Sequence, residues 1–185
     1  MRCFVALDLE DDFIKEISNI QNRIKKRNLF LGKFTESENL HLTLKFLGEI
    51  DDIKIEEVKK RLEEIKLWGF EASLGEIGVF SKSFPKIIWI KLNGAGIWDL
   101  QKQIDSKLKD LFEVEERFMS HITIARIKKV GDKKELLNYL KSIKPKKISF
   151  KVKEFSLKKS DLFPEGPRYG DLENYEFSSP PIFTN

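Results

Sequence analysis

Both histidines of the chain begin the same four-residue pattern, in which a histidine and a threonine alternate with aliphatic residues. The two copies are His41-Leu42-Thr43-Leu44 and His121-Ile122-Thr123-Ile124. Because side chains alternate between the two faces of a β-strand, each copy places its histidine and threonine on one face and its aliphatic residues on the other. The pattern predicts two amphipathic strands that each carry an acid–base group beside a hydroxyl group.

The two motifs lie 80 residues apart, and other predicted elements recur near the same offset. Each half of the chain reads as strand, helix, motif strand, helix and strand. Besides the motif strands, the predicted elements are at 4–9, 13–26, 52–66 and 70–80 in the first half and at 87–92, 97–112, 132–140 and 150–160 in the second. This repetition indicates a duplicated unit.

These elements predict an α+β fold, a single bilobal domain over residues 1–185 with two antiparallel sheets and outer helices around a central groove. The segment Asn93-Gly94-Ala95-Gly96 interrupts the pattern, so the boundary between the duplicated halves is expected near 93–96. It is too short for a free linker, so the halves should pack closely. The C-terminal segment is expected to close the fold.

The composition is that of a globular chain. Hydrophobic residues make up 41% and charged residues 35%, and no apolar run is long enough to span a bilayer, so no membrane association is expected. The chain reaches Asp8 too early for a secretory signal, and its one cysteine, Cys3, permits no internal disulfide, so a cytoplasmic location is expected. No feature marks a dimer surface, so we expect a monomer. Residues expected in the core include Cys3, Trp68, Trp89 and Trp98.

Positive charge is concentrated in the second half of the chain. Between His121 and Ser160 there are thirteen Lys or Arg residues against three Asp or Glu residues. Such a field would attract phosphates and give salt-dependent association with nucleic acid. A solvated lysine-rich surface is the alternative interpretation.

Two such strands facing each other would bring two imidazoles and two hydroxyls to opposite sides of one bound group. This arrangement suits in-line displacement at phosphorus, because a neutral imidazole accepts a proton from the nucleophile while an imidazolium gives one to the departing oxygen. The threonine hydroxyls would hydrogen-bond the non-bridging oxygens. No metal or other cofactor is required. A metal site that adds Glu49, Asp51 or Asp52 to the histidines is less favoured, because metal-binding sequences usually show three or more ligands at tight spacing.

The motif segments resemble the paired signatures of the two-histidine phosphoesterase superfamily, and more narrowly those of the RNA 2',3'-cyclic phosphodiesterases, long called 2'-5' RNA ligases. The similarity extends over nearly the whole chain. The segments that carry it are Arg2–Leu9, Asn39–Glu49, Ser120–Ile127, Glu154–Leu157 and Gly166–Tyr169.

This resemblance implies hydrolysis of an RNA 2',3'-cyclic phosphate to a 2'-phosphomonoester, with RNA bearing such ends as the partner. It implies that His41 donates a proton to the leaving oxygen, that His121 accepts one from water, and that Thr43 and Thr123 bind phosphate. The near symmetry of the halves leaves the order of the histidines open. A reversible 2'-5' RNA ligase and an RNA-binding module without turnover are the alternative functions.

Further substrate-binding candidates flank the motifs. Arg126 matches a family position, but strict alternation turns it away from the groove unless the strand contains a bulge. Lys45 follows His41 and Thr43 on the groove face and would contact phosphate or backbone, or lie at the rim. Residues 158–169 are interpreted as a loop over the cleft. Aromatic candidates for stacking on the terminal base are Phe46, Phe84 and Tyr169.

Overall fold

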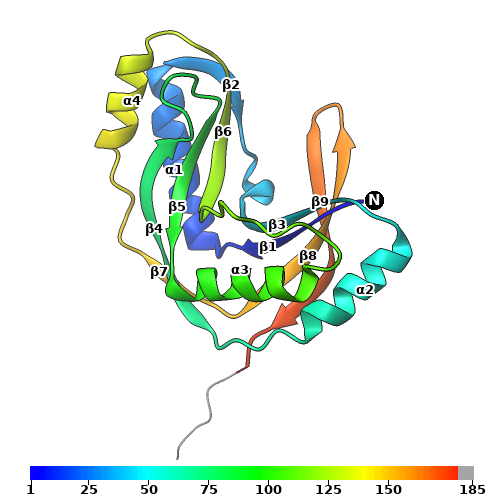
Figure 1. Ribbon diagram of the computed structural model, residues 1–185. Coiled ribbons are helices and arrows are strands. Elements are labelled where there is room, and N and C mark those ends of the chain that lie inside the picture. The colour runs from blue at the N-terminus through cyan, green and yellow to red at the C-terminus, as the bar shows by residue number, and fades with distance from the viewer. Residues whose placement is uncertain (179–185) are drawn as a thin grey trace, which may run out of the picture.

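The computed structural model describes residues 1–178 (Figure 1). Its strands are β1 (Arg2–Asp8), β2 (Phe30–Phe34), β3 (His41–Glu49), β4 (Phe70–Val79), β5 (Ile87–Asn93), β6 (His121–Val130), β7 (Ser149–Val152), β8 (Glu154–Phe163) and β9 (Gly166–Glu176). Its helices are α1 (Asp11–Arg27), the short 3-10 helix η1 (Ser37–Asn39), α2 (Asp52–Glu63), α3 (Ala95–Leu108) and α4 (Lys133–Ser142).

The strands form one curled antiparallel sheet in the order β7-β4-β5-β6-β3-β1-β8-β9, with β2 paired to β6. A single residue pair, Leu42 with Ile122, joins β3 to β6. Two groups of strands therefore meet at one point, and helices lie outside them (Figure 1). The predicted α+β fold with antiparallel strands is confirmed, and the two predicted sheets are continuous through this one pair.

Strands from the two halves of the sequence are exchanged between the groups. The strand β4 comes from the first half but pairs with β5 and β7, whereas β8 comes from the second half and pairs with β1. The exchange interlocks the two groups, and the motif strands β3 and β6 lie side by side where the groups meet. The last seven residues of the predicted 1–185 unit, 179–185, lie outside the described residues.

Helix α1 shows how apolar spacing positions the second motif. Phe13, Ile17, Ile20 and Ile24 recur every three or four residues and are almost completely buried. Burial of each such side chain contributes about 1.5–3 kcal/mol. On the same helix, the buried amide of Gln21 donates to the carbonyl oxygen of Ile124 at 2.9 Å, which ties the helix to the β6 motif.

The structure differs from several local expectations. Residues 158–169 belong to the β8–β9 hairpin, in which 158–163 pair residue by residue with 166–171 on the two sides of a turn at Pro164 and Glu165. The alternating run 150–160 is divided between β7 and β8 at Lys153, whose carbonyl oxygen accepts a hydrogen bond from the amide of Phe177. Strand β2 was not predicted from the sequence. Cys3 and Trp89 are buried as expected, whereas Trp68 and Trp98 are exposed.

Within residues 1–178, no helix is long and apolar enough to cross a membrane.

Candidate active site

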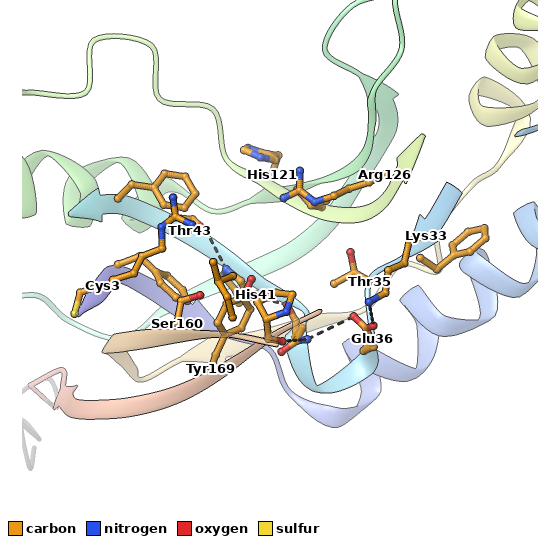
Figure 2. Close-up of a pocket in the computed structure, with 18 of the residues that line it drawn as sticks. Cys3, Lys33, Thr35, Glu36, His41, Thr43, His121, Arg126, Ser160 and Tyr169 are labelled. Carbon is orange, nitrogen blue, oxygen red and sulfur yellow. Dashed lines mark hydrogen bonds and ion pairs between the residues drawn. The ribbon is translucent and has the colours of Figure 1, made fainter. Parts of the chain in front are cut away.

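A cavity of about 480 Å³ lies where the two groups of strands meet (Figure 2). Both motif strands, β1, the β2–η1 segment and the β8–β9 hairpin contribute to its walls. The residues of the two motifs that line it are His41, Thr43, His121 and Thr123. The structure therefore brings the four motif side chains into one site.

The backbone pair between Leu42 and Ile122 fixes how the motifs face each other. Each of these residues lies between the histidine and the threonine of its own motif. Because the pairing is antiparallel, the register sets His41 beside Thr123 and Thr43 beside His121. An approximate twofold axis through this pair relates the imidazoles and hydroxyls.

Backbone carbonyl groups orient both imidazoles. The Nδ1 atom of His41 lies 2.8 Å from the carbonyl oxygen of Asn39, and that of His121 lies 2.7 Å from the carbonyl oxygen of Met119. A carbonyl oxygen can only accept, so Nδ1 carries the hydrogen in both rings, and the neutral form leaves its lone pair on Nε2. The Nε2 atom of His41 accepts from the hydroxyl of Thr43 at 3.0 Å. Both rings are thus held in the tautomer that can accept a proton at Nε2.

Burial keeps both imidazoles neutral in the free protein. It lowers the pKa of His41 from 6.5 to about 4, although the hydrogen bond to Asn39 and the negative charge of Asp8 oppose this shift. Burial also lowers the pKa of His121, against its hydrogen bond to Met119. A bound anion would favour the charged form of either ring.

Aromatic side chains surround the histidines and account for this burial. The ring of His41 lies 5.0 Å from that of Phe4 and 5.1 Å from that of Tyr169, measured between centroids. The ring of His121 lies 4.8 Å from that of Phe80. These contacts remove water from one side of each imidazole, which strengthens electrostatic interactions with a bound group.

A bulge in each motif strand changes which residue faces the cavity. The pairing of β3 with β1 shifts at Leu44, and the pairing of β6 with β5 shifts at Ile124, the last residue of each motif. Each shift inserts one residue and so reverses the alternation that follows. Phe46 and Arg126 consequently line the cavity, at equivalent positions of the two strands. The sequence analysis required a bulge for Arg126, and the structure contains it.

The same bulge makes the expectation for Lys45 wrong. Its side chain is 4% exposed and forms an ion pair with Asp105, which is 7% exposed. Its Nζ also donates to the carbonyl oxygen of Glu113 at 2.6 Å. Lys45 therefore joins β3 to α3 and to the segment before β6, and does not face the cavity.

Two of the three aromatic candidates for base stacking line the cavity. Tyr169 and Phe46 line the cavity, whereas Phe84 is 77% exposed and lies outside it. Cavity residues beyond the predicted ones include Arg2, Phe4, Lys33, Glu36, Asn39 and Ser160. For Arg2 and Phe4, alternation along the first strand was an available signal. The others depend on β2 and the hairpin, which were not expected.

The metal interpretation lacks a suitable ligand set. Among residues 1–178, no three histidine, cysteine, aspartate or glutamate side chains are grouped closely enough to hold a metal ion. Glu49, Asp51 and Asp52 do not line the cavity that contains the histidines.

The curled sheet and the paired His-Thr strands define a two-histidine phosphoesterase. The family model described as LigT-like phosphoesterase matches residues 7–89 and 93–169. The chain therefore belongs to the LigT-like phosphoesterase family, a family of enzymes.

Named relatives agree with this assignment over nearly their whole length. The chain is 34% identical to the RNA 2',3'-cyclic phosphodiesterase of Methanocaldococcus jannaschii, with 95% of this chain and 100% of the relative covered. It is 33% identical to the RNA 2',3'-cyclic phosphodiesterase of Thermotoga maritima, with 96% of each chain covered.

Solved structures share the fold. The crystal structure of LigT from E. coli complexed with phosphate matches with a TM-score of 0.76 at 25% identity, covering 96% of this chain and 97% of the other. The structure of TT0787 from Thermus thermophilus matches with a TM-score of 0.82 at 24% identity, covering 96% and 98%.

Proposed function

We propose that the protein hydrolyses 2',3'-cyclic phosphodiester ends of RNA to 2'-phosphomonoesters by metal-independent acid–base catalysis. The observation that carries this proposal is the convergence of two imidazoles and two threonine hydroxyls on one cavity. The names of the relatives and the basic second half of the chain support RNA as the substrate.

In the proposed reaction a water oxygen attacks phosphorus and transfers a proton to Nε2 of His121. The bond from phosphorus to O3' breaks, and O3' receives a proton from Nε2 of His41. The hydroxyls of Thr43 and Thr123 donate to the non-bridging oxygens, whose charge they stabilise in the transition state. The product is a 2'-phosphomonoester with a free 3'-hydroxyl, and the two imidazoles exchange protonation states.

The surroundings of the two histidines differ. The carboxylate of Asp8 lies near His41 and opposes the lowering of its pKa, and Asp8 is held by Lys158 at 2.9 Å and by the hydroxyl of Ser156 at 3.0 Å. His121 has no comparable carboxylate among the causes of its pKa shift. Burial and the charge of Lys158 outweigh Asp8 and lower the pKa of His41 to about 4, so His41 is assigned as the donor from its position in the family's motif order and not from its electrostatics.

Product analysis tests the proposal directly. We expect an oligonucleotide ending in a 2',3'-cyclic phosphate to yield only the 2'-phosphate, with undiminished rate in the presence of a chelator, as followed by phosphorus NMR. A 3'-phosphate product, no product, or loss of activity with the chelator would contradict it. Joining of a cyclic-phosphate end to a 5'-hydroxyl end in the same assay would indicate ligase activity, and salt-sensitive binding without product would indicate a binding module.

The pH dependence of kcat/KM gives a second test. Because burial lowers the pKa of both His41 and His121, we expect a bell-shaped profile whose maximum lies below pH 6.5. As the pH rises above both pKa values, the imidazolium donor becomes scarce and activity falls; as the pH falls below the pKa of His121, the neutral acceptor is lost. Since bound phosphate raises both pKa values, the profile of kcat should lie at higher pH. A maximum of kcat/KM above about pH 7.5 would contradict this explanation.

A further inference from the structure

The two ends of the cavity differ in openness. Along β3, Asn39 precedes His41 on one side, and Phe46 and Gly48 follow Thr43 on the other. Figure 2 shows the same order, with Lys33 and Glu36 on one side of His41 and Cys3 on the other. These two directions define the Lys33 end and the Arg2 end of the cavity, since Arg2 pairs with Glu49 at the far end of β3.

The Lys33 end is tied shut by the β8–β9 hairpin. Lys33 forms an ion pair with Glu36 at 2.7 Å and donates to the carbonyl oxygen of Glu165 at the tip of the β8–β9 hairpin. Asn39 donates to the carbonyl oxygen of Pro167 at 3.0 Å on the same hairpin. The hydrogen bond from Lys33 lowers the pKa of Glu36, so that end presents a carboxylate. Arg126, in register with Lys33, also places a cation near this end, so the hairpin contacts and not the charge obstruct the exit of a nucleotide chain there.

The Arg2 end has the opposite properties. Among residues 1–178, Arg2 has no ion-pair or side-chain hydrogen-bond partner, and its side chain lines the cavity. Phe46 beside it is 75% exposed. A side chain placed at Gly48 would meet no atom within 4 Å, so the space beside it is open. The hydrogen bond from the amide of Ile50 to the carbonyl oxygen of Met1, at 2.9 Å, fixes the backbone next to Arg2.

The groups along this end follow the order of an RNA chain. On β1, Ala6 pairs with Thr43, Phe4 with Phe46, and Arg2 with Glu49. Along these paired strands the hydroxyl of Thr43 comes first, the rings of Phe4 and Phe46 come next, and the guanidinium of Arg2 comes last. Ala6 and Arg2 are four residues apart, which is about 13 Å along a strand. One nucleoside together with an extended arginine side chain can span this distance.

We propose that Arg2 and Phe46 form a subsite for the nucleotide chain on the 5' side of the cyclic phosphate. Arg2 binds the phosphate that links the terminal nucleotide to its neighbour, and the terminal nucleoside lies against Phe46. The enzyme is then specific for oligonucleotides over 2',3'-cyclic mononucleotides, which lack that phosphate. This inference rests on the proposed function.

The test compares two substrates that share their terminal nucleotide, a 2',3'-cyclic mononucleotide and a tetranucleotide with a 2',3'-cyclic phosphate end. The protein carries no added residues at its N-terminus. We expect the wild type to favour the tetranucleotide and the kcat/KM ratio of the two substrates to fall about tenfold in Arg2→Gln, as loss of a charge-assisted hydrogen bond implies. The matched control is Arg23→Gln, an exposed arginine on α1 that loses the same charge and should keep the wild-type ratio.

An unchanged ratio in Arg2→Gln, or an equal fall with Arg23→Gln, would overturn the subsite. Failure of the wild type to hydrolyse either substrate would instead refute the proposed function, and the subsite is then measured by binding. For a tetranucleotide with a 3'-phosphate, Arg2→Gln should reduce the slope of log K against log salt by about 0.7, the value for one contact with single-stranded nucleic acid. An unchanged slope would overturn the subsite on its own.

Discussion

Substitution of either histidine by alanine is expected to lower kcat for the cyclic phosphodiester by about 10²–10⁴-fold, the contribution of a positioned acid or base. Either change removes one of the two proton-transfer groups while leaving the cavity and its threonine hydroxyls in place. Because the imidazoles act on one transition state, the double variant His41→Ala/His121→Ala should lose much less than the product of the single effects. Initial rates at saturating substrate, with thermal melts to confirm folding, measure these losses.

A matched control comes from the aromatic residue that the structure places outside the cavity. Phe84→Ala should retain wild-type kcat, because this side chain is 77% exposed and does not line the site. A loss in Phe84→Ala similar to that of the histidine variants would show that the assay reports general damage. Wild-type activity in both single histidine variants would refute the proposed mechanism.

A change of leaving group separates the two histidine roles. If the 3' bridging oxygen is replaced by sulfur, the departing thiolate needs no proton, since thiols have pKa values near 8.5. This substrate should restore most of the activity of His41→Ala and little of that of His121→Ala. Rescue of His121→Ala alone would reverse the assignment of donor and acceptor.

The motif strands could be predicted because alternation is a local property of the sequence. His41 and Thr43, and likewise His121 and Thr123, share a face whatever the strands pair with. The chemistry of the site follows from those four residues. The pairing of Leu42 with Ile122, which sets the motifs against each other, joins strands from the two halves of the chain. Such long-range pairing leaves no mark in the local pattern.

The bulges explain why the sequence pattern did not predict which residues after each threonine face the cavity. One inserted residue after Thr43 and one after Thr123 reverse the faces of the residues that follow, and β3 shifts register again at Leu47. Strict alternation therefore predicts that Lys45 faces the groove, whereas Phe46 occupies that position in the structure. The hairpin was missed for another reason, because Pro164, Gly166 and Pro167 are typical of loops and here flank or form a tight turn.

The buried Lys45 gives the second large expected effect, a loss of about 3–5 kcal/mol in the free energy of unfolding for Lys45→Met. Its Nζ is the positive partner of Asp105, which also accepts from Gln101 at 2.6 Å and from the amide of Glu115 at 3.0 Å. Methionine fills the space but leaves a buried carboxylate without its cation. Urea unfolding measures the loss.

A second substitution separates loss of the ion pair from loss of packing. Lys45→Met/Asp105→Asn removes the uncompensated charge and should recover part of the stability, whereas Lys128→Met, at an exposed lysine on β6, should stay within about 0.5 kcal/mol of the wild type. A loss below about 1 kcal/mol in Lys45→Met, or no recovery in the double variant, would contradict the role of the pair. The segment that the pair anchors leads to Met119, whose carbonyl group orients His121. Lys45→Met should therefore lower kcat under conditions where the protein remains folded, although Lys45 does not face the cavity.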